Sequence, residues 1–208
     1  MKKKAVWAIF VFAGFLAGSG CAFAADIPSV VRGNAAFSAD LFSRIAASKP
    51  DGNIFFSPHS ISVALAMTYA GAGGRTAEQI ASAMHFQGSG EDLHGSFAAL
   101  AAVLEQKKGS CRLEVANALW GQEGYPFLQD FIGLIDRHYG GGFRTVNFKE
   151  RKEEARAAIN EWAAANTSGK IRELLKPEIL TELTRLVLTN AIYFRGNWAA
   201  RFDPEQTT

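Results

Sequence analysis

Cysteine is scarce in this chain of 208 residues, which contains only Cys21 and Cys111. The disulfide framework of a small stapled domain is therefore excluded. An excess of one charge is also lacking, because 22 basic residues are balanced by 20 acidic ones. A near-neutral chain has no electrostatic reason to bind nucleic acid or anionic lipid, so we expect no nucleic acid and no membrane as partners. With 48% apolar residues, the chain can bury one sizeable core.

Catalytic motifs are missing as well. The sequence contains no G-x-S-x-G, H-E-x-x-H or C-x-x-C pattern and no glycine-rich phosphate loop. His59, in the run Ser57-Pro-His-Ser60, is a candidate hydrolase base, but no acidic residue that would orient it is identifiable. We keep that hydrolase as an alternative and interpret His59 as an ordinary residue of a helix start. Since His85, His94 and His138 lack the spacing of metal ligands, we expect no catalytic residue, metal or cofactor.

Residues 1–24 have the pattern of a secretory signal peptide. Lys2-Lys3-Lys4 is followed by an apolar run from Ala5 to Leu16 and by Ala22-Phe23-Ala24, which fits a small-residue cleavage site. The apolar run is too short to span a bilayer comfortably. We therefore expect residues 25–208 to belong to a single secreted domain, extracellular or periplasmic. The lysine-rich start is typical of a bacterial leader.

A lipoprotein leader is the alternative, because Gly18-Ser-Gly-Cys21 faintly resembles its signal. That signal has Leu three residues before the cysteine, where this chain has Gly18. Lipidation at Cys21 is the one route by which we would expect membrane attachment. Cleavage after Ala24 would instead remove three lysines, leaving 19 basic against 20 acidic residues and Cys111 as the one thiol.

Hydrophobic periodicity predicts an α+β fold. Spacings of three and four residues predict helices that begin near Asn34, Pro58 and Thr76, and others over residues 93–104, 127–139 and 150–166. Alternation with a period of two predicts strands over residues 113–120, 143–148 and 186–194, and a short buried strand over 53–56. Several helices should therefore pack on a sheet.

The stretch from Leu186 to Trp198 is the strongest strand signal, because it is long and rich in β-branched and aromatic residues. Both of its faces are mostly apolar, which favours a central strand that is covered on both sides. Asn190 interrupts one apolar row. A buried amide without partners loses about 1–3 kcal/mol, so another segment must bring hydroxyls or amides to Asn190.

Three ordered blocks of the sequence resemble the N-terminal half of a serpin, a member of the serine protease inhibitor superfamily. The first block runs from Asn53 to Ile80 and contains NIFFSPHSISVALAM and GAGGRTAEQI. The second is Asn160 with the run TSGKI at 167–171. The third is LTNAIYFRGNW at 188–198, followed by Phe202 and Thr207. The resemblance covers nearly all of residues 25–208.

The resemblance implies the serpin fold, with several helices packed on a large mixed sheet A and part of a sheet B. It also implies that Ser57, Ser60 and Asn190 lie together beneath sheet A, in the region called the shutter. Trp198 would lie at the breach, where the sheet opens. Serine hydroxyls at the start of a buried helix would be sensible partners for the Asn190 amide.

The resemblance further implies a secreted, monomeric inhibitor of a serine or cysteine protease. Serpins present a reactive loop as bait, and the cleaved loop inserts into sheet A. Serpins are roughly twice as long as this chain, so we expect the chain to stop before the reactive loop and to inhibit nothing when made alone. A non-inhibitory serpin that acts as a binding, carrier or chaperone protein is the alternative.

Overall fold

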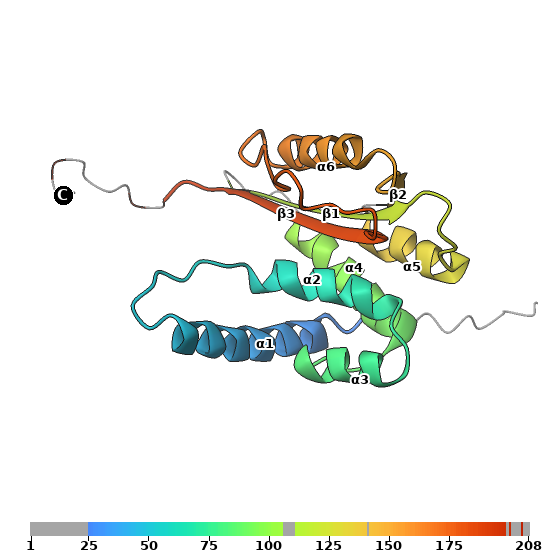
Figure 1. Ribbon diagram of the computed structural model, residues 1–208. Helices are drawn as coiled ribbons and strands as arrows, with labels where there is room; N and C mark the ends of the chain where they lie inside the picture. Colours follow the sequence, from blue (N-terminus) through green and yellow to red (C-terminus); the bar gives the residue numbers. More distant parts are fainter. Residues whose placement is uncertain (1–24, 106–110, 141, 199, 201–204, 206–208) are drawn as a thin grey trace, which may run out of the picture.

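The computed structural model describes residues 25–105, 111–140, 142–198, 200 and 205 (Figure 1). The predicted signal peptide, with Cys21, lies outside these described residues. The helices are α1 (Ile27–Ser48), α2 (Pro58–Ala70), α3 (Gly74–Ala83), α4 (Gly90–Leu104), α5 (Gln129–Tyr139) and α6 (Lys152–Asn166). The strands are β1 (Arg112–Gln122), β2 (Phe143–Val146) and β3 (Leu186–Arg195). In the described ranges, no helix combines the length and the apolar character needed to cross a membrane.

The three strands form one mixed sheet with the order β2-β1-β3. β1 pairs with β2 in parallel, and with β3 antiparallel through a continuous register of ten residue pairs. The sequence predicts a central position for β3 in the whole fold; in the described part of the chain, β1 is central and β3 lies at an edge of the sheet. The expectation that both faces of β3 are covered is confirmed, because Leu188 and Ala191 pack in hydrophobic clusters on opposite sides of the sheet.

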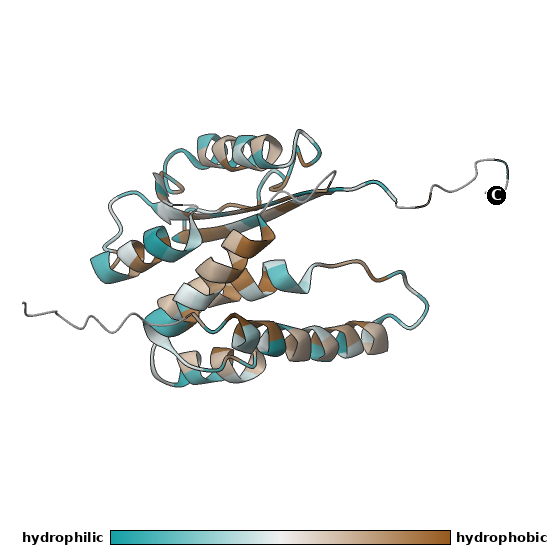
Figure 2. Cartoon of the chain, turned by 180° about the vertical axis from the view of Figure 1, so that it is seen from behind, coloured by the Kyte–Doolittle hydropathy of each residue, from teal (hydrophilic) through white to brown (hydrophobic). Residues whose placement is uncertain are grey.

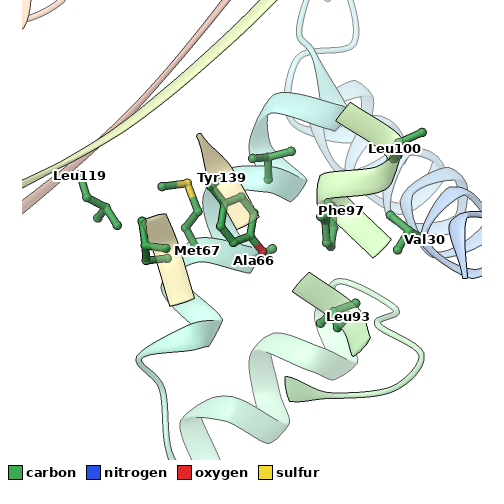
Figure 3. Packing of buried hydrophobic residues seen from close by; sticks show 10 residues of the cluster. Val30, Ala66, Met67, Leu93, Phe97, Leu100, Leu119 and Tyr139 are labelled. Carbon is green, nitrogen blue, oxygen red and sulfur yellow. The ribbon is translucent and has the colours of Figure 1, made fainter. Parts of the chain in front are cut away.

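Helices cover the sheet on both faces (Figure 1). Helix α6 lies on one face, where its Ile159 and Trp162 pack against the strands. The other face carries the larger cluster, in which Met67 and Phe97 from the helices meet Leu119 of β1 (Figure 3). Hydrophobic residues accordingly gather on the strands and on the helices next to them (Figure 2). The core therefore has two halves, separated by the sheet.

Two helices start earlier than their hydrophobic spacing predicts. Helix α1 begins at Ile27 rather than near Asn34, because the Asp26 side chain accepts a hydrogen bond from the backbone nitrogen of Ser29 at 2.9 Å and caps the helix there. Helix α3 begins at Gly74 rather than at Thr76, and no side chain caps it. The apolar stripe gives the face of a helix, whereas its first residue depends on the local cap.

The short buried strand predicted over residues 53–56 is wrong for this structure. These residues form no strand, and the Phe55 side chain is fully exposed. A strand needs a neighbour to pair with its backbone groups, and the described residues supply none here. The second sheet implied by the resemblance is correspondingly not seen in the described part of the chain.

Candidate functional site

The start of α2 carries the two serines of the predicted shutter. Ser57 is the N-cap, and its Oγ accepts hydrogen bonds from the Ser60 backbone nitrogen at 3.3 Å and from the Ser60 hydroxyl at 3.1 Å. Pro58 occupies the first helical position. A backbone N–H at this position has no partner within the helix, so proline, which lacks one, costs no hydrogen bond here. Both serines are half-buried. This part of the sequence prediction is confirmed, since Ser57-Pro58 begins α2 as expected.

Asn190 finds its partner on the neighbouring strand. Its Nδ2 donates a hydrogen bond to Oδ1 of Asn117 at 2.6 Å, and the two residues are register partners in β1 and β3. Both side chains face the helices beneath the sheet, because Leu119 and Leu188, two residues along each strand, pack in the cluster on that side. The structure therefore contains an amide pair that ties β1 to β3 within an otherwise apolar surface.

The serine hydroxyls were the expected partners of Asn190, and this expectation needs correction, because the partner in the structure is Asn117. The described residues show no hydrogen bond between Asn190 and Ser57 or Ser60. Helix α2 does pack against β3, so the two serines begin a helix on the side of the sheet that Asn190 faces. Their common role as a shutter stays a prediction. Asn117 was the missed residue, although it is a second amide in an alternating apolar strand and so carried a signal of its own.

The opposite face of the sheet has a polar anchor as well. Trp120 Nε1 donates to the Thr189 hydroxyl at 2.9 Å, and this hydroxyl donates to the Ala118 carbonyl at 3.1 Å. Trp162 of α6 packs edge-on against the Trp120 ring, with centroids 6.3 Å apart. Helix α6 is thus fixed over β1 and β3 by aromatic packing above a satisfied, buried hydrogen-bond network.

The segment after α6 is held by a second asparagine. Asn160 donates from Nδ2 to the Leu175 carbonyl at 2.9 Å, and its Oδ1 accepts from the Leu175 backbone nitrogen at 2.8 Å. The amide side chain therefore satisfies both backbone groups of one residue, as a neighbouring strand would. This contact fixes the connection between α6 and β3 against the helix.

A cavity of about 240 Å³ lies between β1 and the helices beneath it, with His59, Asn117, Arg137 and His138 among its lining residues. The Nε2 atom of His59 is buried and has no hydrogen-bond partner among the described residues. Burial lowers the pKa of His59, so its ring is neutral at neutral pH. The hydrolase alternative needs a bond between His59 and a serine hydroxyl, and the Ser60 hydroxyl is bound to Ser57 instead.

A second histidine, His94 of α4, is fully buried and lies against α5. Its Nδ1 is 2.5 Å from the Tyr139 hydroxyl, and burial lowers the pKa of His94 to about 4. His138 is paired with Glu91, which also accepts a hydrogen bond from Arg137 at 2.5 Å. Among the described residues, no group of three or more His, Cys, Asp or Glu side chains is placed to hold a metal ion.

Trp198, the predicted breach residue, lies three residues beyond the end of β3. Its side chain is 73% exposed. The described residues do not show how the sheet opens, so the breach role of Trp198 stays a prediction. The free thiol of Cys111, at the start of β1, is exposed.

This arrangement of helices and strands matches a known family. The family described as "Serpin (serine protease inhibitor)" matches residues 32–208. Since this range is most of the chain, the chain belongs to the serpin family. The fold class inferred from the sequence is confirmed, and the chain corresponds to the N-terminal part of that fold.

Curated relatives carry the names of protease inhibitors. Leukocyte elastase inhibitor A of Rattus norvegicus is 43% identical over 175 residues, which cover 84% of this chain and 46% of that protein. Leukocyte elastase inhibitor of Homo sapiens is 42% identical over 175 residues, with the same shares. The chain thus spans about half the length of the curated relatives it matches. Because these relatives are vertebrate proteins, they give no support to the bacterial character suggested by the leader.

Solved structures agree with the sequence relatives. Ovalbumin from emu (Dromaius novaehollandiae) matches with a TM-score of 0.80 at 30% identity, over 86% of this chain and 50% of that one. Cleaved kallistatin complexed with heparin also gives a TM-score of 0.80 at 30% identity, over 88% of this chain and 53% of that one. The described elements therefore have the arrangement of half a serpin.

Proposed function

We propose that this chain is the N-terminal part of a secreted serpin that inhibits serine endopeptidases, or cysteine proteases, and has no enzymatic activity of its own. The observation that carries the proposal is the identity of 43% to an elastase inhibitor over 84% of the chain. The tied strands β1 and β3, packed between α6 and the helices beneath, are the scaffold that such an inhibitor uses.

The mechanism follows from strand addition to a sheet. A loop that inserts beside β3 forms on the order of ten to twenty backbone hydrogen bonds, each contributing about 1 kcal/mol net, and buries side chains on both faces. β1 and β3 share ten register pairs and the Asn117–Asn190 bond, so they move as one body when the sheet opens. When the sheet opens, β1 and β3 must therefore move together over the helices beneath the sheet.

The function is tested by mixing the full-length protein with elastase-like and other serine proteases. We expect one target to form a complex that survives denaturing electrophoresis, because the acyl-enzyme is trapped covalently. The full-length protein incubated in buffer without protease serves as the control. Cleavage of the full-length protein by every protease, without any stable complex, would contradict inhibition and favour the binding, carrier or chaperone alternative.

Secretion is part of the proposal and rests on the pattern of residues 1–24. We expect the exported full-length protein to begin at Ala25, as determined by intact-mass measurement. A mass that corresponds to a lipid-modified Cys21 would identify the lipoprotein leader instead. An exported protein that retains Met1 would show that the leader is not removed.

A further inference from the structure

Three of the four histidines of the chain gather beneath β1, although they are far apart in sequence. His59 lies at the start of α2, His94 in α4 and His138 near the end of α5. The rings of His94 and His138 have centroids 6.4 Å apart, and His59 and His138 line the same cavity of about 240 Å³. We call these three residues the histidine cluster.

The three rings are in different states. His94 is 1% exposed, and its Nδ1 atom is hydrogen-bonded to the Tyr139 hydroxyl. His59 has a buried Nε2 without a partner in the described residues. His138 is paired with Glu91 at the protein surface. The cluster therefore holds one fully buried ring, His94, one half-buried ring with an unpartnered buried nitrogen, His59, and a third ring, His138, that contacts the Glu91 carboxylate.

Burial is the main cause of the lowered pKa of His94; among the neighbouring charges, His138 lowers this pKa further and Glu91 raises it. Helix α5 contributes Arg137, which is bound to Glu91, and burial raises the pKa of Tyr139, so that its hydroxyl stays neutral. Helix α4 contributes Glu91, whose pKa is lowered by its hydrogen bonds to His138 and Arg137, and the exposed Glu105. Towards the other elements, the neighbouring groups are Tyr69 of α2 and Asn117 of β1. Asp26, before α1, donates from its backbone nitrogen to the Ser96 hydroxyl, while its carboxylate accepts from the Ser29 backbone nitrogen.

We propose that the histidine cluster is an acid switch, in which protonation of His59 and His94 loosens the packing of α4 and α5 beneath the sheet. The pKa of His59 and that of His94 are both below the ordinary value of 6.5, so the packed form is stabilised above pH 6.5. As the pH falls from 6.5 toward 4, the opened form binds protons that the packed form excludes, and the packed form loses stability. His94 alone shifts this equilibrium about thirtyfold between pH 7.4 and pH 5.

The histidine cluster lies on helices that connect to the strands of the sheet, so loosening these helices affects the sheet. Helix α4 leads into β1, and α5 is the crossover between the parallel strands β1 and β2. Loosening α4 and α5 frees this part of the sheet to slide over α2. Acid would then promote sheet opening and loss of the inhibitory form; this consequence rests on the proposed function, whereas the switch itself does not.

The switch is tested by native-state hydrogen exchange of the full-length protein at pH 7.4, 6 and 5, with rates corrected for the intrinsic pH dependence. We expect the protection of amides in 90–104 and 129–139 to fall about thirtyfold or more at pH 5. In His59→Gln/His94→Gln, which keeps hydrogen-bonding side chains that do not titrate, this fall should disappear. His59→Gln alone should reduce this fall in protection. The single variant replaces the double variant in the test if the protein does not tolerate substitution of the buried His94.

His85→Gln is the matched control, because it removes the fourth histidine, which lies outside the cluster and is paired with Asp40. It should retain the wild-type response of α4 and α5. Unchanged protection of the wild-type protein at pH 5, or an undiminished response in the double variant, would overturn the switch. Because hydrogen exchange requires no protease, failure of inhibition at pH 7.4 would contradict the proposed function without bearing on the switch.

Discussion

Asn190→Leu in the full-length protein is expected to shift the monomeric inhibitor toward latent or polymeric forms. The substitution removes the amide that donates to Asn117 at 2.6 Å and leaves the Asn117 side chain without this partner beneath the sheet. A fully buried unpaired amide costs about 1–3 kcal/mol, and because Asn117 is half-buried we expect the lower end, about 1 kcal/mol, or roughly a fivefold change in the equilibrium between closed and rearranged sheets. Gel filtration and residual inhibition, measured after incubation at 37 °C, report the two forms.

Asn166→Leu is the matched control for this experiment. It makes the same chemical change, but the Asn166 amide donates to the Trp162 carbonyl of its own helix, at 2.8 Å, and not to a neighbouring strand among the described residues. We expect this variant to stay monomeric and inhibitory. Wild-type inhibition and monomeric gel filtration of Asn190→Leu would show that the amide pair does not hold the closed sheet.

Trp162→Ala is expected to destabilise the full-length protein by about 3–5 kcal/mol. The Trp162 side chain is 8% exposed and packs edge-on against Trp120, within a cluster that also contains the fully buried Ile159. Its removal leaves a cavity between α6 and the sheet, which the rigid strands cannot fill. The midpoint of urea unfolding, together with amide protection in α6, measures the loss.

Glu161→Ala provides the comparison on the same helix. Glu161 is exposed, and a surface substitution of this kind changes stability by about 0.5 kcal/mol or less. If Trp162→Ala shifted the urea midpoint no more than Glu161→Ala, the packing of α6 on the sheet would not contribute to stability in solution.

The hydrogen bonding around Asn190 could be inferred only in part from the sequence. The sequence showed that Asn190 breaks an apolar row and must find a partner, and the resemblance pointed to Ser57 and Ser60. The structure gives Asn117, 73 residues earlier in the chain, as the hydrogen-bond partner. A side chain's need for a partner is local, but the identity of the partner depends on strand register, which the composition of one strand does not specify.

Apart from the strand wrongly predicted over residues 53–56, the sequence alone determined which described segments are helices or strands, that Ser57-Pro58 starts α2, and which residues of β1 and β3 share a face. These features follow from backbone periodicity and local capping, which act over a few residues. Only the tertiary structure decided that β1 rather than β3 is central in the described sheet, and that His59, His94 and His138 meet beneath it. Such proximity arises from the packing of helices on a sheet, where contacts are set by the fold rather than by distance along the chain.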